Sequence, residues 1–384
     1  MVEDWQSGGF GLYIHWPFCE AKCPYCDFNS FVSRSVDHGA WRDAYISEIR
    51  RSAAELGPRS LNSVYFGGGT PSLMEPKTVG SILDEAAKQW NFSNDIEITL
   101  EANPSSVEVK RFQGYRSAGV NRVSLGVQAL NGPDLKALGR VHTVAEALDA
   151  LKTAKSTFDR ISFDLIYGRQ NQSLEDWQSE LIQAVGFGTD HLSLYQLTIE
   201  PGTAFGDRYK LGKLRGLPSE DLGADMYDLT QEICKAHGMP AYEVSNHAAP
   251  DQQSRHNLIY WNYGDYVGIG PGAHGRVTLN GQRHATETHL NPTTWLTEAR
   301  NGNAMSLRSA VSSTAQGEEY LMMSLRTTLG LDRARHERLA GHPLDEDTLR
   351  HLQSLGMIEV TATHVRTTSA GRPVLNAIIQ ELAA

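Results

Sequence analysis

Short apolar runs alternate with amphipathic stretches through the N-terminal half of the chain, and this alternation limits the fold more than any other feature. The runs have the length and composition of strands buried on both faces. The stretches repeat apolar residues three or four positions apart, as helices packed on a sheet do. We therefore expect an α/β fold with a parallel sheet, curved into a partial (β/α)6-type barrel or closed into a complete one. The expected strands are 11–15, 63–66, 96–100, 122–127, 161–166 and 191–197, and the expected helices are 41–56, 79–90, 144–151 and 174–185.

Glycines and polar side chains stand at or near the ends of these strands. In sheets of this kind, ligands bind at the edge where the carboxyl ends of the strands meet. We therefore expect one shared pocket, although each residue taken alone is more often a surface group or part of a structural ion pair. Its chemistry suits a ligand with an ammonium group, a carboxylate and ribose hydroxyls. The candidates are Gly68, Gly69, Thr70, Glu101, Gln128, Arg140 and Asp164.

Three cysteines, Cys19, Cys23 and Cys26, follow the first expected strand, with no fourth nearby. Three thiolates on one loop can hold a four-iron cluster and leave one iron open to a ligand. A zinc site with His15 as the fourth ligand is the alternative, although structural zinc ligands usually come as two separated pairs. A disulfide is disfavoured because the sequence shows no secretory context. We expect the remaining cysteine, Cys234, to be a buried apolar residue of a helix.

Two glycine-rich segments superficially suggest nucleotide-binding loops. Residues 67–70 lack the Gly-Lys-Ser/Thr ending that a triphosphate site needs, but their backbone N–H groups can still meet a ligand. A tight turn is the alternative for this segment. Residues 268–272 lack the strand, helix and downstream acid of a dinucleotide site, so we interpret them as a backbone packing segment.

A possible metal ligand, an amide and two aromatic rings come together in residues 256–261. An exposed imidazole beside aromatic surface can bind heme iron while the rings cover the macrocycle. The alternative is a histidine whose hydrogen bonds are satisfied in an aromatic corner of the core. The residues in question are His256, Asn257, Tyr260 and Trp261.

The last part of the chain has a different character, with helical patterns at 318–325 and 348–355 and a hairpin pattern at 357–360 and 364–366. Helices followed by a hairpin suggest a winged-helix-like module. DNA binding is disfavoured because residues 332–384 contain six arginines, no lysine and seven acidic residues. We expect a core barrel over 1–240, a region over 241–310 that completes the barrel and carries the aromatic motif, and a small C-terminal domain over 311–384, acting as a lid or docking module.

Taken together, these motifs resemble the radical S-adenosylmethionine (SAM) family that includes oxygen-independent coproporphyrinogen III oxidase. The resemblance rests on 13–29, 67–71, 124–128, 164–168 and 256–261, and it favours an iron-sulfur cluster over zinc. It implies a radical SAM barrel in which Cys19, Cys23 and Cys26 hold a 4Fe-4S cluster whose open iron binds SAM. Reduction of SAM by that cluster yields methionine and a deoxyadenosyl radical. The matching SAM-binding positions are Tyr13, Tyr25, Gly68, Gly69, Thr70, Glu101, Gln128, Arg140 and Asp164.

Within that family, the sequence is similar to a heme-chaperone branch. Phe28 stands where the oxidases carry a further cysteine, and only twelve residues precede Tyr13, where the oxidases have a longer extension. The branch is implied to bind heme and pass it to heme-requiring proteins, with residues 256–261 as the heme motif and His256 facing the iron. The alternative is a radical SAM coproporphyrinogen III dehydrogenase, so the resemblance leaves open whether the chain is an enzyme.

The expected partners are heme and acceptor hemoproteins, membrane-associated ones included, and a homodimer is left open. Nucleic acid is not expected, because the formal net charge of −10 provides no general attraction to phosphate. The N-terminus is acidic and polar and has no signal-peptide pattern, and no apolar run approaches the length of a membrane span. We therefore expect a cytoplasmic protein.

Overall fold

The computed structural model describes residues 3–33 and 35–383. Its centre is an eleven-stranded sheet, in which six parallel strands lie side by side in the order in which they occur along the chain. This confirms the expected α/β unit of six strands. The six are β1 (Phe10–Trp16), β4 (Ser60–Gly68), β5 (Asn91–Ala102), β6 (Arg122–Gln128), β7 (Arg160–Tyr167) and β8 (His191–Gln196).

Further strands extend this unit on both sides without closing it. β10 lies parallel to β1 on one side, and three antiparallel strands continue the sheet outwards from it. On the other side β9 pairs antiparallel with β8. The sheet therefore runs from β13 to β9 as an open, partial barrel. The added strands are β9 (Asn246–Ala248), β10 (Asp265–Ile269), β11 (His274–Leu279), β12 (Gln282–Thr288) and β13 (Met305–Ala310).

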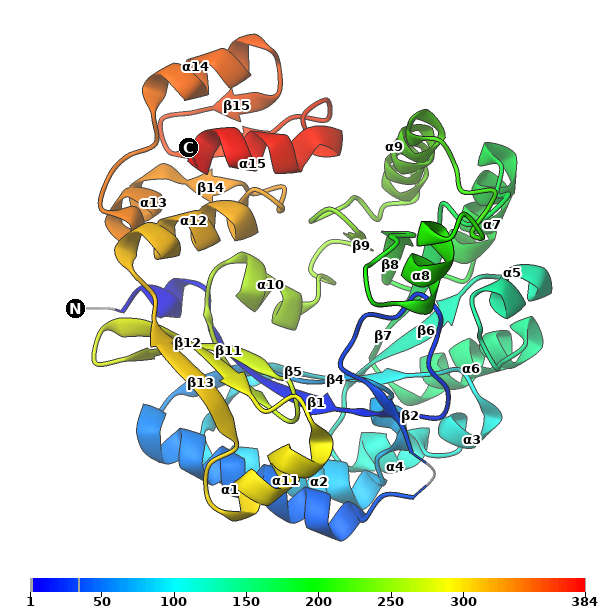
Figure 1. The fold of residues 1–384 in the computed structure, drawn as a ribbon, viewed down its shortest axis with the longest axis vertical. Helices are drawn as coiled ribbons and strands as arrows, with labels where there is room; N and C mark the ends of the chain where they lie inside the picture. Colours follow the sequence, from blue (N-terminus) through cyan, green and yellow to red (C-terminus); the bar gives the residue numbers. More distant parts are fainter. Residues whose placement is uncertain (1–2, 34, 384) are drawn as a thin grey trace.

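Helices cover the outer face of the curved sheet, whereas α10 lies on its inner side (Figure 1). The outer packing buries large aromatic rings, such as Trp41 stacked on Trp295 with ring centroids 5.3 Å apart. The helices of this part are α1 (His38–Leu56), α2 (Pro76–Gln89), α3 (Ser106–Val109), α4 (Phe112–Ser117), α5 (Gly132–Ala137), α6 (Val144–Thr157), α7 (Leu174–Gly186), α8 (Ala204–Lys210), α9 (Glu220–Ala236), α10 (Arg255–Trp261) and α11 (Pro292–Arg300). Three-residue and four-residue 3-10 helices lie at Asp4–Ser7, Pro71–Leu73 and Arg372–Val374.

Local sequence sets where two of the expected helices begin. Thr143 and Glu146 form a capping box at the start of α6, and Ser173 and Asp176 form one at the start of α7. In each box, two side chains satisfy N–H groups that the first helical turn leaves without partners. Farther along, α9 buries Cys234, as expected from the sequence. None of the helices in 3–33 and 35–383 is both long and apolar enough to cross a membrane.

The C-terminal part forms a small domain with its own apolar core, which includes Leu321, Leu352 and Val365. The expected hairpin is present as β15 and β16, and the two expected helical segments overlap α12 and α14. A short strand, β14, pairs with β16 and completes a three-stranded sheet. The elements are α12 (Ser313–Ser324), β14 (Leu331–Asp332), α13 (Arg333–Ala340), α14 (Glu346–Ser354), β15 (Ile358–Val360), β16 (His364–Thr367) and α15 (Leu375–Ala383).

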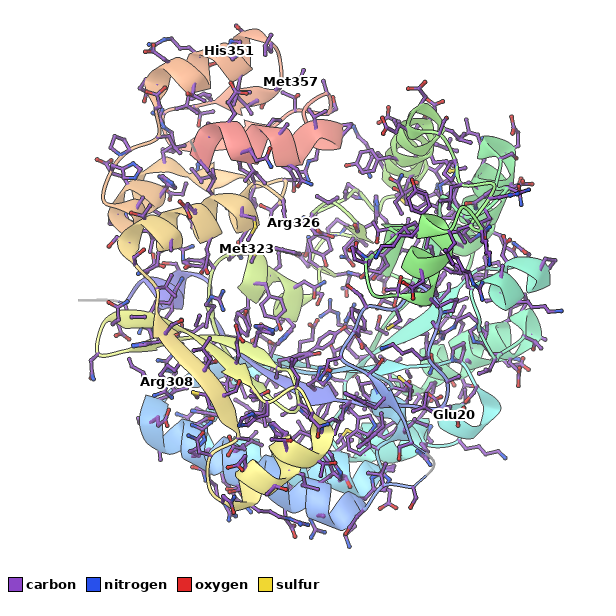
Figure 2. The ribbon with its side chains drawn as sticks, in the orientation of Figure 1. Glu20, Arg308, Met323, Arg326, His351 and Met357 are labelled. Carbon is purple, nitrogen blue, oxygen red and sulfur yellow. The ribbon has the colours of Figure 1, made fainter. Side chains whose placement is uncertain are left out.

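Polar contacts fasten this domain to the barrel. The buried Arg335 donates to both carboxylate oxygens of Asp4 at 2.8 Å and to the Asn262 carbonyl oxygen at 2.8 Å. Met323 and Arg326, at the C-terminal end of α12 and just beyond it, face towards α10 (Figure 2). The Arg326 guanidinium lies 4.9 Å from the ring centroid of Trp261 on α10. The domain thus lies beside the inner side of the sheet, next to the aromatic motif.

Candidate functional site

The three cysteines lie on or beside one loop, residues 20–30, called the cysteine loop below. Its ends are joined by the short parallel strands β2 (Phe18–Cys19) and β3 (Phe31–Val32). Cys19 is buried, Cys23 and Cys26 are half-buried, and none of them forms a disulfide. Within the described residues, no three His, Cys, Asp or Glu side chains converge to hold a single metal ion. A four-iron cluster requires no such convergence, because each thiolate binds a different iron atom.

Three hydrogen bonds of Asn29 hold the cysteine loop in place. The Asn29 side-chain amide donates to the carbonyl oxygens of Pro271 and Leu290, both at 2.9 Å, and the Asn29 carbonyl oxygen is hydrogen-bonded to His15 Nε2 at 2.9 Å. Beneath the loop, a Cβ on Gly69 would lie 2.8 Å from the Phe18 carbonyl oxygen and 3.0 Å from Cys19 Sγ. Only glycine allows the backbone to approach the first thiol this closely.

The glycine-rich segment 268–272 supports the loop from the other side. A Cβ on Gly270 would lie 2.2 Å from the His15 carbonyl oxygen, and one on Gly272 would lie 2.6 Å from Asn29 Nδ2. Gly270 has a φ of 119°, a conformation that favours glycine. This confirms the interpretation of the segment as backbone packing.

Two carboxyl groups lie on strands β5 and β7 of the barrel, with β6 between these strands. Glu101, near the end of β5, accepts a hydrogen bond from the Tyr65 hydroxyl at 2.7 Å, and Asp164 on β7 accepts one from Ser124 at 3.4 Å. Burial raises the pKa of Glu101 to about 7, and the charge of Asp164 adds to this effect. Burial raises the pKa of Asp164 to about 6. A ligand that brings a cation or hydroxyl donors would stabilise both ionised groups.

Arg140 connects the cysteine loop with the strand ends. Its Nη1 donates to Cys23 Sγ at 3.3 Å, and its Nη2 donates to Asn103 Oδ1 at 2.5 Å and to the Gly126 carbonyl oxygen at 2.8 Å. Burial lowers the pKa of the guanidinium, but the charges of Tyr25 and Cys23 outweigh burial, so the pKa is raised overall. Arg140 therefore carries a positive charge at the first turn of the loop.

Gln128, the last residue of β6, has a φ of 75°, which is uncommon for a residue other than glycine. Its Oε1 is buried and has no hydrogen-bond partner in the described structure, and the same holds for Arg140 Nε. Buried polar atoms without partners are costly, and strained backbone often marks a binding site. An acceptor and a donor beside two carboxyl groups fit a ligand with amino, carboxylate and hydroxyl groups, as SAM has.

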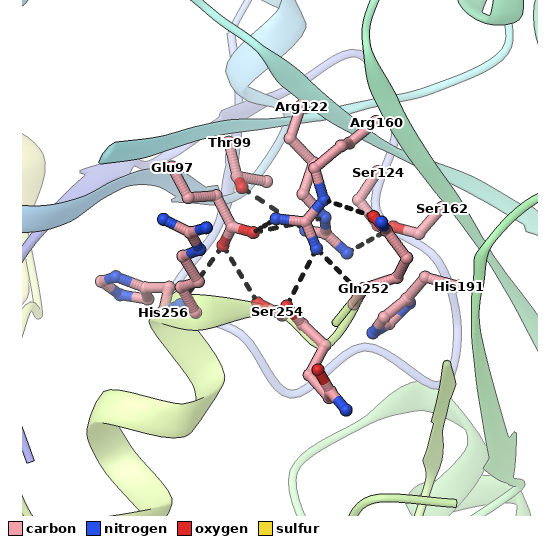
Figure 3. A network of polar contacts seen from close by, with 12 residues as sticks. Glu97, Thr99, Arg122, Ser124, Arg160, Ser162, His191, Gln252, Ser254 and His256 are labelled. Atoms are coloured by element: carbon pink, nitrogen blue, oxygen red, sulfur yellow. Dashed lines mark hydrogen bonds and ion pairs between the residues drawn. The ribbon is translucent and has the colours of Figure 1, made fainter. Parts of the chain in front are cut away.

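A buried polar network fixes α10 inside the barrel (Figure 3). The Glu97 carboxylate on β5 accepts from Arg160 at 2.5 Å and from the backbone N–H of His256 at 3.3 Å. Arg160 on β7 also donates to the carbonyl oxygens of Gln252 and Gln253, at 2.7 and 2.9 Å. Ser254 caps the start of α10 through the N–H of residue 257. Two strands of the barrel therefore set the position of the aromatic motif.

His256 lies in the interior, 1% exposed. Its Nδ1 is hydrogen-bonded to Ser63 Oγ at 2.7 Å and its Nε2 to the Tyr260 hydroxyl at 2.7 Å, and its ring stacks on Tyr65. Burial, helped by the charge of Arg122, lowers the pKa of His256 to about 3. Both ring nitrogens are thus engaged and the ring is neutral. As an iron ligand, His256 stays a prediction that requires the ring to give up one of these hydrogen bonds.

A cavity of about 560 Å³ opens between the cysteine loop, the sheet and the C-terminal domain. Its volume lies in the range of ordinary ligand pockets. The cysteine loop contributes Asp27, Phe28 and Asn29, and the sheet contributes Tyr13, Gly68 and Glu101. The expected SAM-binding edge and the end of the cysteine loop therefore face the same space.

Four aromatic residues, called the aromatic wall below, form another part of the cavity lining. Tyr260 and Trp261 of α10 and Tyr263 and Tyr266 after it all line the space. The rings of Tyr260 and Tyr266 meet edge to face with centroids 4.5 Å apart. His256 and Asn257 do not line it, and the Asn257 amide instead donates to the Tyr242 hydroxyl at 3.5 Å. Of the expected heme motif, Tyr260 and Trp261 thus line the cavity, whereas His256 and Asn257 lie behind them.

Comparison with known proteins shows which family this chain resembles. The Radical SAM superfamily matches residues 13–181, and the HemN C-terminal domain matches residues 311–374. The heme chaperone HemW of Escherichia coli (strain K12) is 36% identical over 376 residues, which are 96% of this chain and 97% of that protein. The chain belongs to the HemW family of radical SAM proteins.

Other relatives agree with membership of the HemW family. The mouse (Mus musculus) protein named radical S-adenosyl methionine domain-containing protein 1, mitochondrial, is 40% identical over 328 residues, 83% of this chain and 74% of that protein. Among solved structures, the coproporphyrinogen III oxidase HemN from Escherichia coli aligns with a TM-score of 0.81 at 23% identity, covering 98% of this chain and 90% of that one. This likeness confirms the radical SAM fold. The mitochondrial location belongs to the mouse protein's name, and for this chain a cytoplasmic location stays a prediction.

In this HemW-family chain, sequence reasoning did not single out several residues of the site. Tyr65 donates a hydrogen bond to Glu101, and Asn103 accepts one from Arg140. Three more such residues line the cavity: His274, Arg276 and Met323. The last three belong to β11 and α12, which follow the recognised motifs by many residues. The sequence did contain a signal for Tyr65 and Asn103. Tyr65 is on the strand that leads to Gly68, and Asn103 follows the strand that carries Glu101, and both of those residues were candidates.

Proposed function

We propose that this protein is a heme chaperone, which binds heme in the cavity and passes it to acceptor hemoproteins. Under this proposal, Cys19, Cys23 and Cys26 hold a 4Fe-4S cluster whose open iron takes SAM. The observation that carries the proposal is one cavity whose lining combines the end of the cysteine loop, the strand-end residues Gly68 and Glu101, and the four rings of the aromatic wall. The chain belongs to the HemW family, in which relatives are named heme chaperones, and this supports heme as the molecule that the cavity binds.

The residues around the cysteine loop suit the cluster and SAM. Arg140 donates to Cys23 Sγ and brings a positive charge to a sulfur that would bind a cluster iron. Gly69 offers backbone without a side chain beside Cys19, where the methionyl part of SAM is expected, and Gly68 lies against the His15 ring. When bound, the reduced cluster supplies the electron that cleaves SAM. Glu101, Gln128 and Asp164 then remain to hold the amino and hydroxyl groups of the ligand, with Tyr13 and Tyr25 flanking the site.

The aromatic wall suits a flat, largely apolar macrocycle. Tyr260, Trp261 and Tyr266 present ring surfaces to the cavity, and aromatic faces and edges pack favourably on one another. Arg326 lies 4.9 Å from the centroid of the Trp261 ring, and Arg276, which is paired with Glu319, also lines the cavity. Cations beside an apolar wall are what a ring with two propionates requires.

Heme titration of the purified, anaerobically reconstituted protein tests the proposal. We expect one heme per chain, and we expect the Tyr260→Ala/Trp261→Ala variant to bind at least tenfold more weakly, a loss of about 1.4 kcal/mol or more. Tyr209→Ala is the control, because Tyr209 is an exposed aromatic residue on α8, away from the cavity. A wild-type protein that takes up no heme, or equal affinity in all three proteins, would contradict the proposal.

The dehydrogenase alternative needs a separate assay. Reconstituted protein is incubated with a reductant, SAM and coproporphyrinogen III, and both protoporphyrinogen and deoxyadenosine are measured. A heme chaperone should release no protoporphyrinogen. Phe28 occupies the end of the cysteine loop, lines the cavity and is 56% exposed, so no further thiol is available at that position. Protoporphyrinogen formation would establish the enzyme instead.

A further inference from the structure

Heme iron needs a protein donor with a free lone pair, and a neutral imidazole nitrogen is a common choice. Two histidines line the cavity, His15 and His274. His15 is not available, because its Nδ1 is hydrogen-bonded to the Tyr13 hydroxyl at 3.1 Å and its Nε2 to the Asn29 carbonyl oxygen at 2.9 Å. His256 is engaged at both nitrogens in the same way.

His274 differs from both of them. It is the first residue of β11, its side chain is 60% exposed, and its imidazole makes no hydrogen bond within the described residues. The nearest acid is Glu287 on the neighbouring strand β12, whose carboxylate lies 3.9 Å from Nδ1. Metal-binding histidines commonly face a carboxylate with the nitrogen that does not bind the metal. That arrangement leaves Nε2 of His274 as the donor.

The backbone that carries His274 is held firmly, although the side chain is free. The Thr288 hydroxyl accepts from the N–H of Ala273 at 2.9 Å and donates to the Gly270 carbonyl oxygen at 2.5 Å. A Cβ on Gly268 would lie 1.9 Å from the His274 carbonyl oxygen, so the two strands approach there as only glycine permits. A fixed backbone with an unengaged imidazole at a cavity is suited to ligand binding.

A second soft donor lines the cavity from the C-terminal domain. Met323 lies on α12 one helical turn after Glu319, and Glu319 is paired with Arg276 of β11 at 2.8 Å. This ion pair brings α12 next to β11, the strand that begins with His274. Histidine with methionine is a known pair of axial heme ligands. Both donors therefore line the same cavity as the aromatic wall.

From these positions we infer that His274 binds the heme iron through Nε2, with Met323 as a second axial donor. The inference rests on the proposed function, because it assigns the iron ligand of the same cavity. His256 then acts as a positioning residue that holds the Tyr260 hydroxyl and so the aromatic wall. A single exposed imidazole and a thioether can exchange with ligands of an acceptor more readily than two buried imidazoles can, as transfer requires.

Heme titration with absorption spectroscopy tests the assignment in the full-length protein. His274→Ala should still take up heme on the aromatic wall, with affinity reduced at least tenfold and a changed Soret band, and added imidazole should restore the wild-type spectrum. Met323→Leu should shift the spectrum without removing the histidine signature. His351→Ala is a matched control, because His351 is 59% exposed, lies 3.8 Å from Glu381 and is far from the cavity on α14 (Figure 2).

The outcomes separate this inference from the function on which it rests. Wild-type affinity and spectrum in His274→Ala would overturn the assignment of the ligand, while heme binding by the wild-type protein would leave the chaperone proposal standing. An equal loss of heme affinity in His351→Ala would also overturn the ligand assignment, because it would show that heme binds to surface histidines in general. A spectral change in His256→Ala that equals the expected His274→Ala change would return the ligand role to His256. No heme uptake by the wild-type protein would end both proposals.

Discussion

Glu101 and Asp164 show how single residues prepare the site for a ligand. Both are carboxyl groups on the inner side of the barrel, and burial is the main reason why the pKa of each is raised. The Tyr65 hydroxyl and the Ser124 hydroxyl only partly offset this effect. Without a ligand, the fold therefore contains two acids whose ionisation is unfavourable, and a ligand with an ammonium group or hydroxyls relieves that cost.

This arrangement predicts how stability depends on pH. The pKa of Glu101 is raised in the folded state, so the folded protein keeps a proton that the unfolded chain loses. The free energy of unfolding must then fall as the pH rises from the unfolded value towards about 7, by about 3 kcal/mol for Glu101. Glu101→Gln should remove most of this fall. Thermal unfolding of the cluster-free protein between pH 5 and 8 measures this fall, and Glu175→Gln is the control because Glu175 is exposed. Identical pH profiles for Glu101→Gln and wild type would contradict the expectation.

At the scale of elements, the strands of the barrel both present the site and hold α10. Glu97 and Arg160 extend from β5 and β7, and together they bind the segment that leads into α10 (Figure 3). A helix of only seven residues has little stability of its own, so tertiary contacts must hold it. The aromatic wall therefore depends on a buried ion pair that lies outside the cavity.

Arg160→Ala should release this segment. It leaves Glu97 buried with only the more distant Arg122, 3.9 Å away, and loss of one partner of a buried pair typically costs about 3 to 5 kcal/mol. We expect a lower Tm and weaker heme binding with unchanged iron content after reconstitution, because the cysteine loop makes no contact with Arg160. Arg116→Ala is the control, since Arg116 and Asp159 form an exposed pair expected to contribute at most about 1 kcal/mol. If iron content fell in parallel with heme binding, the network would serve the whole barrel rather than α10.

At the scale of the whole molecule, the C-terminal domain supplies one side of the cavity. Glu319 and Met323 of α12 line it, and Tyr263 of the barrel region donates its hydroxyl to Glu319 at 2.6 Å and packs into the core of the domain. Residues 311–374 match the HemN C-terminal domain, and with eight acidic residues against seven arginines they offer no basic surface for DNA, while their role as a docking module stays a prediction. Under the proposed function, we therefore expect heme release to depend on how firmly this domain is docked.

Arg335→Ala tests that dependence. Arg335 is 7% exposed and connects α13 to Asp4 and to the Asn262 carbonyl oxygen, and hydrogen bonds of this charged kind contribute about 1.5 to 3 kcal/mol each. We expect faster heme dissociation, measured by transfer to apomyoglobin, with unchanged cluster content. Arg338→Ala on the exposed face of the same helix should behave as wild type. An unaltered dissociation rate in Arg335→Ala would show that the domain does not limit release.

Much of the fold could be predicted from the sequence because its signals are local. Apolar runs mark strands wherever they occur, and capping residues such as Thr143 and Ser173 start helices without distant partners. The parallel order of the strands then brought Gly68, Glu101 and Asp164 to one edge, as expected. β5 is longer than its apolar run, beginning at Asn91, because pairing with β4 also orders its polar start.

The sequence by itself determined the six-stranded parallel unit, the three-cysteine loop and the groups at the strand ends, because periodicity and spacing along the chain specify them. Only the tertiary structure decided which side chains face the cavity. His256 stands in a motif that suggests exposure, yet Ser63 and Tyr260 enclose it, whereas His274 has no motif and lines the cavity beside Met323. The physical reason is that side-chain exposure depends on packing between elements far apart in the sequence, and no local pattern encodes it.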